Sequence, residues 1–557
     1  MSWQGKILRI NLTSGELTPE PLNMEWANDY IGERGLATKY LWENMDPKAD
    51  AMSPDNALIF ATGPLTGTNA STSGRYAVVT KGPLTGAIAC SNSGGKFGAE
   101  LKYAGFDLLL IEGRSEKPVY LLIEGDEISL VSADKIWGKT VWETDAWIKK
   151  QHHNPMLKIA TIGVAGERGV RYAAVVNDLH RAAGRSGVGT VMGSKNLKAI
   201  AIRGTGGVRV KDPKRFMEVT DEMKNLLAKS TGGLTKYGTN AMMDTMQEFG
   251  GLPTNNFQQV QFDGADKIDA KAMLKTDETG HTNLLTNKAC FGCTIACGRI
   301  AHIREDHFTI QNRKEYWHAS GGLEYETAFA FGPVVGVDDI DACTFAGYLM
   351  NEHGVDPISF GVTLAAAMEL YEMGVITTDD TDGVELKFGN AEALTIMAEK
   401  TGKQEGFGKI LGMGSRRMCE KYGHPELSMT VKGQEFAGYD SRALQGMGLG
   451  YATGNRGACH LKHDTFDVDM DDQTGEGKAE PCKTSQDWTA AVDSSGLCMF
   501  TMGAWGAPEF AAQLDADSEG EWTAERLTQS GERIWNLERM FNLAAGLTRA
   551  DDTLPER

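Results

Sequence analysis

The chain has 557 residues, with 56 Lys or Arg against 75 Asp or Glu, so its formal net charge is −19. This charge disfavours nucleic acid and anionic membrane surfaces as partners, and a length above roughly 250–300 residues predicts more than one hydrophobic core. The N-terminus has no apolar signal core, and no window approaches the roughly 18–20 continuous apolar residues of a membrane span. We therefore expect a cytoplasmic protein without a membrane segment.

Residues 1 to about 205 alternate short apolar runs with turn residues. The runs are KILRINL, ALIFATG, RYAVVTKG, FDLLLIEG, PVYLLIEG, KIATIG and KAIAIRG. Short strands separated by Gly, Pro, Asn and Asp predict a β-rich first domain.

Helical spacing dominates after Asp212, which precedes Pro213 as a helix cap. The other clear helices are predicted over 339–353, 358–373, 391–400 and 407–422, and in the tail after Thr523. The acidic stretch 464–480 is predicted to be an exposed loop. The fold class is therefore α+β, with a β-rich domain (1–205) followed by two mainly helical domains (206–405 and 406–557).

Three of the nine cysteines cluster in KACFGCTIACGR as Cys290, Cys293 and Cys297. An odd number of cysteines without a secretion signal favours metal ligation over disulfides. The C-x2-C-x3-C run suits three irons of an iron–sulfur cube, whose fourth ligand must come from elsewhere. Zinc and radical-SAM sites prefer other spacings, and three plain buried thiols are the remaining alternative.

Cys498 stands apart because it closes DSSGLC, in which Asp493 and Gly496 predict a tight turn that can hold a polar ligand beside the thiol. The other cysteines are expected to be small buried side chains. They are Cys90, Cys343, Cys419, Cys459 and Cys482.

A glycine-rich basic segment, RAAGRSGVGTVMGSKNLKAIAIRG, contains Arg181 and Arg185. Its glycines allow backbone N–H groups to approach an anion, and its arginines can pair with phosphate, so it predicts a phosphate cradle. The alternative is an ordinary glycine-rich connection with surface arginines. The segment SNSGGKFG and Arg75 are candidates to line the same pocket.

Two segments offer acid–base groups. GGLEYETAFAFG places Glu324 and Glu326 among aromatic residues, where partial burial can tune a carboxylate as a general base, and on a strand the two would share one face. YATGNRGACHLKHD places His460 and His463 after a turn, which suits a hydrogen-bond donor. The alternative for each residue is a surface or structural role.

These segments together resemble the aldehyde:ferredoxin oxidoreductase family of tungsten bis-pterin enzymes, and the likeness runs over nearly the whole chain. The resemblance implies a β-rich pterin-binding domain followed by two helical domains. It also implies interconversion of small aldehydes and carboxylic acids at a tungsten (or molybdenum) bis-molybdopterin. Electrons would pass through one [4Fe–4S] cluster to ferredoxin or a small iron–sulfur subunit.

The resemblance also implies site residues. Glu326 and His460 match the active-site pair, and the cluster ligands would be Cys290, Cys293, Cys297 and Cys498. A magnesium ion would bridge the two pterin phosphates through the carbonyls of Asn92 and Ala182. The positions that match pterin-binding segments are Arg75, Asn92, Ser93, Gly94, Arg181, Ala182, Gly184, Arg185, Asn351, Gly354, Asp356, Asp493, Gly496 and Leu497.

Two departures from the family pattern stand out. Asn351 occupies a position where the family has an aspartate, and the helix after Asp339 lacks the E-x-x-H pair that holds an interface metal in some relatives. We expect an oligomer, but not that particular homodimer. Two rival functions remain, a class II benzoyl-CoA reductase-type catalytic subunit and a pterin-free iron–sulfur electron-transfer subunit.

Overall fold

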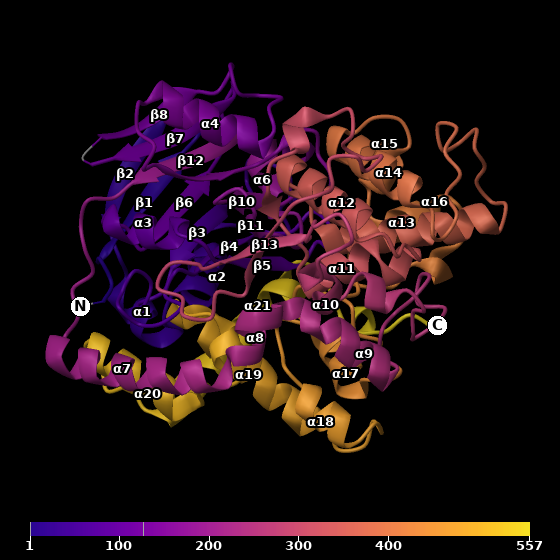
Figure 1. Ribbon diagram of the computed structural model, residues 1–557. Helices are drawn as coiled ribbons and strands as arrows, with labels where there is room; N and C mark the ends of the chain where they lie inside the picture. The colour runs from indigo at the N-terminus through magenta and orange to yellow at the C-terminus, as the bar shows by residue number, and fades with distance from the viewer. Residues whose placement is uncertain (1, 126) are drawn as a thin grey trace.

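The computed structural model describes residues 2–125 and 127–557. Its two large sheets lie in the indigo and violet N-terminal part of Figure 1, and the remainder, coloured magenta to yellow, is mostly helical. The predicted α+β class, with the β-rich region first, is confirmed. Within the described ranges, no helix has the length and apolar content needed to cross a membrane.

Each large sheet has six strands. The first has the order β2 (Glu16–Pro21), β1 (Lys6–Asn11), β6 (Leu108–Glu112), β3 (Leu58–Thr62), β4 (Tyr76–Lys81) and β5 (Ile88–Ser93). The second has the order β11 (Arg181–Ala183), β10 (Val175–Asn177), β9 (Lys158–Thr161), β12 (Leu197–Arg203), β7 (Val119–Glu124) and β8 (Glu127–Ser132). Each of the seven apolar runs identified in the sequence contains one of these strands.

The two sheets pack face to face, and strands such as β3 and β4 are buried along their whole length because both of their faces are covered. Phe60 pairs with Val78 across β3 and β4, and both belong to the core between the sheets. Ile59 and Val79, one residue along, point to the opposite face and pack with the helices beneath the first sheet. Because successive side chains of a strand point to opposite faces of the sheet, neighbouring residues belong to two separate cores.

Six helices belong to the N-terminal part, and α4 begins with a capping box in which Thr140 and Glu143 exchange hydrogen bonds. These helices are α1 (Met24–Tyr30), α2 (Glu33–Asn44), α3 (Phe97–Tyr103), α4 (Val141–Gln151), α5 (Val164–Glu167) and α6 (Val188–Ser194).

The rest of the chain is mainly helical. Asp212 caps a helix with its side chain, as predicted, and Asp339 and Thr523 do the same for the helices that follow them. The helices up to residue 403 are α7 (Pro213–Ser230), α8 (Gly232–Tyr237), α9 (Met242–Phe249), α10 (Ala270–Leu274), α11 (Tyr325–Phe331), α12 (Ile340–His353), α13 (Pro357–Glu372) and α14 (Ala391–Lys403). The later helices are α15 (Gly408–Leu411), α16 (Ser415–Lys421), α17 (Gln445–Thr453), α18 (Phe466–Asp471), α19 (Ala479–Ser495), α20 (Ala507–Asp517) and α21 (Ala524–Ala544).

Two small sheets lie among these helices. One consists of β13 (Leu284–Lys288), β14 (Gly298–Ala301) and β15 (Ser320–Gly321), and the other of β16 (Thr430–Val431) and β17 (Gln434–Glu435). The C-x2-C-x3-C run forms the loop between β13 and β14.

Two sequence-based predictions are wrong in detail. The helix predicted over 407–422 is divided into α15 and α16, because Gly414 adopts a left-handed φ of 87° that ends the helical path. The predicted loop 464–480 contains α18, since the buried carboxylate of Asp469 accepts hydrogen bonds from the amides of Gly446 and Met447 and so holds this segment against α17.

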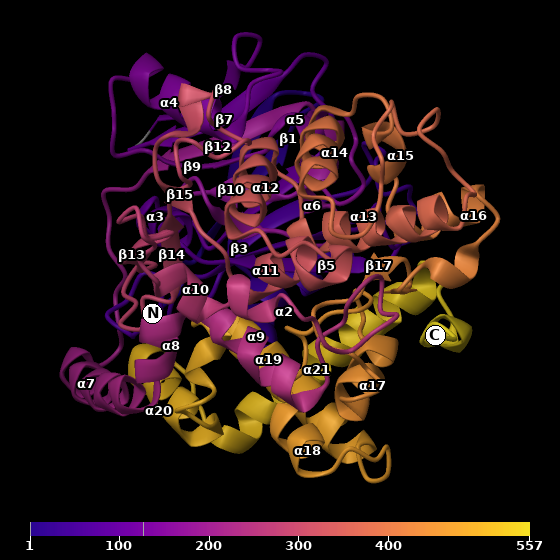
Figure 2. The same cartoon turned by 45° about the vertical axis from the view of Figure 1, so that its right-hand side comes forward.

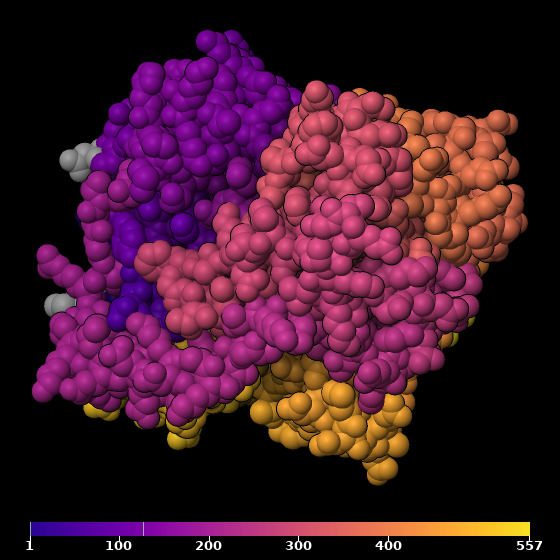
Figure 3. All heavy atoms as spheres, viewed as in Figure 1, coloured from indigo at the N-terminus to yellow at the C-terminus, as the bar shows by residue number. Residues whose placement is uncertain are grey.

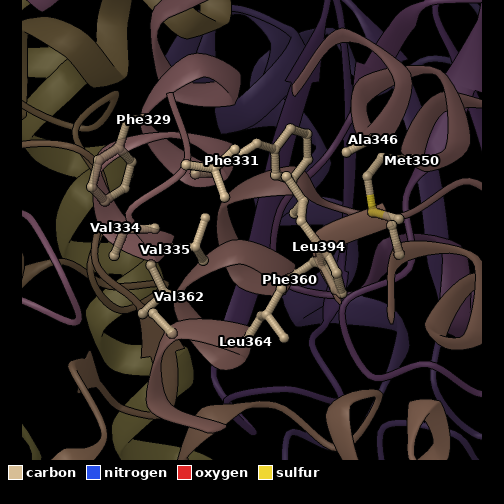
Figure 4. Packing of buried hydrophobic residues seen from close by; sticks show 14 of the residues in the cluster. Phe329, Phe331, Val334, Val335, Ala346, Met350, Phe360, Val362, Leu364 and Leu394 are labelled. Atoms are coloured by element: carbon tan, nitrogen blue, oxygen red, sulfur yellow. The ribbon is translucent and has the colours of Figure 1, made fainter. Parts of the chain in front are cut away.

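A large apolar core surrounds α11, α12 and α13 (Figure 4). Phe329 and Phe331 lie on α11 and are fully buried, and Phe360 and Leu364 of α13 belong to the same core. The buried face of α11 fixes this helix in position, and with it the side chain of Glu326 in its first turn.

The C-terminal helices return to the N-terminal part of the chain. In both Figure 1 and Figure 2, α19 and α21 lie beneath α2, and α2 packs against both. Arg34 of α2 is 1% exposed and forms a bidentate pair with Glu538 of α21, at 2.7 and 2.8 Å. It also contacts Asp493 of α19 at 3.3 Å.

The Arg34 pair predicts a large stability effect. Arg34→Ala leaves the buried carboxylate of Glu538 without its cation and removes one of the two cations that contact Asp493, so we expect the free energy of unfolding to fall by about 3–5 kcal/mol. Urea denaturation followed by tryptophan fluorescence measures this change. Arg9→Ala is the matched control, because Arg9 also pairs with a glutamate, Glu20, but both side chains are about 30% exposed, and it should cost at most about 1 kcal/mol. An equal fall in the free energy of unfolding of Arg34→Ala and Arg9→Ala would contradict the prediction.

Candidate redox and active site

The cysteine loop between β13 and β14 is held against the first sheet by backbone hydrogen bonds. The amide of Phe291 donates to the carbonyl of Gly95 at 2.9 Å, and the amide of Thr72 donates to the carbonyl of Gly292 at 3.0 Å. Cys290 and Cys293 are partly exposed, whereas Cys297 is buried.

The fourth thiol reaches the same loop from the end of α19. Gly496 takes a left-handed φ of 97°, and a Cβ there would lie 2.5 Å from the hydroxyl oxygen of Thr66, so this tight turn requires glycine. The amide of Cys498 then donates to the hydroxyl of Thr72 at 3.1 Å, and Thr72 is the residue that contacts Gly292. The structure thus brings Cys498 beside the cysteine loop.

Arg75 contacts one of the four thiols directly. Its Nη2 donates to Sγ of Cys498 at 2.7 Å and its Nη1 donates to Oδ1 of Asn92 at 3.1 Å. Burial lowers the pKa of this guanidinium, but the charges of Cys498, Cys290 and Cys297 as thiolates outweigh burial and raise it. A Cβ on Gly94 would lie 2.8 Å from Sγ of Cys290, so glycine is needed for the sheet edge to approach this thiol.

The four thiols are a donor set of the kind that an iron–sulfur cube takes. Each thiolate of such a cube binds a separate iron, and here three thiols come from one loop and the fourth from the end of α19. Within residues 2–125 and 127–557, no three His, Cys, Asp or Glu side chains are placed to bind one metal ion together.

The predicted phosphate cradle is only partly free to bind an anion. Arg185 is buried and bonded within the protein, through Nη1 to the carbonyl of Ala458 at 2.8 Å and through Nε to Asp356 at 3.3 Å. Lys195 donates to backbone carbonyls, and Lys198 forms a buried pair with Glu167. Among the described residues, Nη2 of Arg181 is buried without a hydrogen-bond partner, so Arg181 is the candidate anion-binding side chain of this segment.

A small cavity of about 60 Å³ is lined by His180, the neighbour of Arg181 in the sequence, and by Asn351 and Glu324. A Cβ on Gly321 would meet His180 and Asn351 at 2.6 and 3.3 Å, so glycine keeps this space open. Gly354 ends α12 with a φ of 68°, and Asp356 follows it and caps α13 by accepting from Ile358 and Ser359 amides.

The remaining predicted binding positions lie around the same region. Asn92 and Ser93 are on β5, and Ala182 is on β11, which packs beside β5. Gly184 follows β11, and Leu497 is buried next to Cys498. The structure thus gathers the two segments that carry Asn92 and Ala182.

Three cations near the Asp493 turn were missed as site residues. Lys462 donates to Asp493 at 2.5 Å, and a narrow pocket between the N- and C-terminal parts is lined by Arg34, Arg456 and Lys462. Arg456 and Lys462 belong to the motif YATGNRGACHLKHD, but Arg34 stands in an ordinary helix and no sequence signal distinguishes it.

Glu326 and His460 meet in the interior. Oε2 of Glu326 accepts a hydrogen bond from the amide of Gly438 at 3.0 Å, and Oε1 lies 3.5 Å from Nε2 of His460. Oε1 of Glu326 and Nδ1 of His460 are buried without a hydrogen-bond partner in the described part of the chain. Glu324 instead caps α11 and accepts from the hydroxyl of Thr239, so the two glutamates do not share a strand face as considered from the sequence.

Burial shifts the pKa values of Glu326 and His460 in the directions that favour their neutral forms. It raises the pKa of Glu326 to about 8, although the Gly438 amide and the charge of Arg185 oppose this shift. Burial, followed by the positive charges of Arg185 and Arg456, lowers the pKa of His460 well below its usual range. A buried carboxyl group with a pKa near neutrality, beside a neutral imidazole, is suited to accepting and returning a proton.

Aromatic rings enclose this pair, and one of them, Tyr439, lies outside both of the segments that carry the two acid–base groups. The ring centroid of Tyr439 lies 5.7 Å from that of His460 and 5.2 Å from that of Tyr325. The hydroxyl of Tyr451 is buried and has no hydrogen-bond partner in the described structure. His463 packs edge-on against Tyr451 at 6.0 Å and is fully buried on the other side of this ring.

Comparison with known families matches the chain almost from end to end. Residues 7–204 match the model described as aldehyde ferredoxin oxidoreductase, N-terminal domain, and residues 218–557 match the model for domains 2 and 3. The chain is 46% identical to the tungsten-containing aldehyde ferredoxin oxidoreductase of Pyrococcus furiosus, and 45% identical to that of Pyrococcus abyssi. Each alignment covers 99% of this chain and 91% of the relative.

A solved structure has a similar fold. The active-site complex of a benzoyl coenzyme A reductase with 1,5-dienoyl-CoA aligns with a TM-score of 0.87, over 100% of this chain and 91% of that chain. The sequence identity of 24% makes this likeness informative about the fold alone.

Proposed function

The chain belongs to the aldehyde ferredoxin oxidoreductase family, and from that premise we propose that it oxidises aldehydes to carboxylic acids at a tungsten pterin centre. The balanced reaction consumes one aldehyde and one water and yields a carboxylate, three protons and two electrons. The observation that carries the proposal is the buried pair of Glu326 and His460, whose facing atoms lie 3.5 Å apart.

The protein groups have separate roles in this reaction. Glu326, as a carboxylate, accepts the proton released when water adds to the aldehyde carbon. His460 donates a hydrogen bond to the carbonyl oxygen as negative charge develops there, and its unpartnered Nδ1 is available for this. Tyr439 and Tyr325 restrict water around the pair, which strengthens both interactions.

When bound, a tungsten bis-pterin would supply a two-electron acceptor for the aldehyde, and a [4Fe–4S] cluster would supply a one-electron path to ferredoxin or another iron–sulfur protein. The contact of Cys498 with Arg75, and the hydrogen bonds that bring Cys498 beside the cysteine loop, support the cluster assignment. Arg181, Arg75 and the Asp493 turn are proposed to hold the pterins and their phosphates. The carbonyls of Asn92 and Ala182, on adjacent strands, are proposed to hold magnesium between those phosphates.

The two rival functions are less well supported. Identity of 46% over 99% of the chain with a tungsten aldehyde enzyme favours aldehyde chemistry over reduction of an aromatic thioester. A pterin-free electron-transfer subunit would have no use for the buried Glu326–His460 pair or for the unpartnered guanidinium nitrogen of Arg181.

Elemental analysis of the anaerobically purified protein tests the proposal. We expect about one tungsten and about four irons per chain, as one cube requires, together with organic phosphate. The same preparation should reduce benzyl viologen with acetaldehyde or benzaldehyde and leave benzoyl-CoA unchanged. Four irons without tungsten or molybdenum would refute the proposal and favour the pterin-free electron-transfer subunit. Reduction of benzoyl-CoA without aldehyde oxidation would refute it and favour the benzoyl-CoA reductase-type subunit.

The pKa of Glu326 predicts a pH dependence. Because this pKa is raised to about 8, the carboxylate is the minor form at pH 7 and the major form above pH 8. We expect kcat/KM for aldehyde oxidation to rise about tenfold per pH unit below that pKa and to level off above it. A viologen-linked profile from about pH 6 to 10 measures this rise. A flat profile below pH 8 would exclude Glu326 as the base.

A further inference from the structure

The cysteine loop is the only part of the four-thiol site at the surface, as far as the described residues show. Cys297 and Cys498 are 9% and 7% exposed, whereas Cys290, Cys293 and the exposed residues between them reach solvent. In Figure 3 the rose-coloured segment around residue 290 lies at the surface, between the indigo N-terminal part and the magenta α7 and α8. An electron leaving the cluster therefore has its shortest route out through this loop.

Lysines surround the loop although the chain as a whole is acidic. Lys96 is exposed and follows Gly95, whose carbonyl accepts a hydrogen bond from Phe291 within the loop. Lys288 is half-buried at the end of β13, two residues before Cys290. These two lysines flank the loop on the side of the first sheet.

Two more lysines approach from α7 and α8. Nζ of Lys224 donates to Oδ1 of Asn69 at 3.1 Å, and Asn69 belongs to the segment whose Thr72 binds Gly292. Lys236 is exposed and follows Thr235, whose hydroxyl donates to the carbonyl of Ile295 at 2.8 Å. We call Lys96, Lys224, Lys236 and Lys288 the lysine ring.

Few acidic groups offset this charge. Asp178 lies beside Lys96, but its Oδ2 already accepts from the amide of Lys96 at 2.7 Å and from the side chain of Asn177 at 2.8 Å. Asp221 lies on the same face of α7 as Lys224. The other acidic residues of that helix, Glu218 and Glu222, are rotated from Lys224 by about 100° or more about the helix axis. Glu324, whose charge acts on Cys297, lies 3.7 Å from Arg181 and is balanced by it. The four lysines therefore outnumber the carboxylates of Asp178 and Asp221.

Apolar side chains accompany the lysines. Leu179, next to Asp178, is 37% exposed, and Leu285 on β13 is 58% exposed. Exposed leucines within a charged rim are typical of a protein-binding surface, in which apolar contact provides affinity and charge provides orientation.

We infer that the lysine ring is the docking surface for an acidic iron–sulfur electron carrier, a ferredoxin. The inference rests on the proposed function, because it gives the electrons of aldehyde oxidation their destination. Each docking event moves one electron from the reduced cluster of this protein to the oxidised cluster of the carrier. Two carriers are reduced per aldehyde, with no bond or proton transferred at the interface.

Charge reversal at the two members of the ring that lie on α7 and α8 tests this docking surface. Lys224→Glu and Lys236→Glu, singly and together, are compared with Lys150→Glu, an exposed lysine on α4 outside the ring. Holoenzyme and a recombinant ferredoxin of net negative charge are used, and the Kd is measured by biolayer interferometry at low and high salt. Aldehyde-dependent reduction is measured in parallel with that ferredoxin and with benzyl viologen, a small dye that needs no docking surface.

The double variant should raise the Kd and the ferredoxin KM about tenfold at low salt, and by less at high salt, since screening weakens charge pairing. Its iron content and its viologen activity should stay within about twofold of wild type, as should every property of Lys150→Glu. An unchanged Kd in the double variant would overturn the inference. An equal loss of aldehyde-oxidising activity with the dye and with ferredoxin would overturn it too. If wild type oxidises no aldehyde with viologen, the proposed function fails, while the Kd comparison still decides the docking surface.

Discussion

Glu326→Gln should lower kcat for aldehyde oxidation by about 10²–10⁴-fold, the range that general-base catalysis contributes. The amide is close in size to the carboxylate and can still accept from the Gly438 amide, but it cannot take up a proton. The fold around α11 should persist, because its buried face consists of Tyr325, Phe329, Phe331 and alanines. Viologen-linked turnover and metal content, measured on the same sample, separate catalysis from assembly.

Glu324→Gln is the matched control for that variant. Glu324 lies two residues away, is 32% exposed, and pairs with Arg181 at 3.7 Å. Its replacement should change kcat by less than about fivefold. Retained turnover in Glu326→Gln with full tungsten content would defeat the base assignment. Loss of tungsten would show that Glu326 acts in assembly instead.

Cys498→Ala should remove the four-iron cluster. Without the fourth thiolate one iron of the cube has no protein ligand, so the iron content should fall well below about four per chain and the EPR signal of the reduced cube should disappear. Aldehyde-dependent dye reduction should fall with it, since the electrons lose their exit. Iron analysis and low-temperature EPR measure the effect.

Cys482→Ala controls for the loss of a buried thiol. Cys482 lies on the same helix, α19, that leads to Cys498, it is 2% exposed, and burial raises its pKa to about 11. Its removal should leave iron and EPR spectra unchanged. Four irons and an unaltered spectrum in Cys498→Ala would exclude Cys498 as a ligand.

The sequence predicted the local structure best where one rule acts alone. The apolar runs before residue 205 form strands because both of their faces are covered, and the caps at Asp212, Asp339 and Thr523 begin helices because their side chains satisfy free amides. The helix predicted over 407–422 is interrupted because a single left-handed glycine, Gly414, outweighs the periodicity around it. The three-domain division of the chain remains a prediction.

For the site, residue type and motif indicated which side chains matter but not how they are used. Arg185 looked equivalent to Arg181, yet it is bonded to Asp356 and to the carbonyl of Ala458, and only tertiary structure decides this. Arg34 could not be found at all, because its partners are distant in the sequence and no local pattern marks it. The cofactor-binding roles of these residues remain proposals that the variants above test.

The ion pair of Arg34 and Glu538 has a consequence for the timing of assembly. Its two members are 504 residues apart in the sequence. At roughly 5–20 residues per second, the ribosome adds Glu538 about 25–100 s after Arg34. The pocket that Arg34 lines with Arg456, Lys462 and Glu538 is therefore complete only after α21 has been made. Until synthesis is nearly finished, Arg34 stays without its bidentate ion-pair partner.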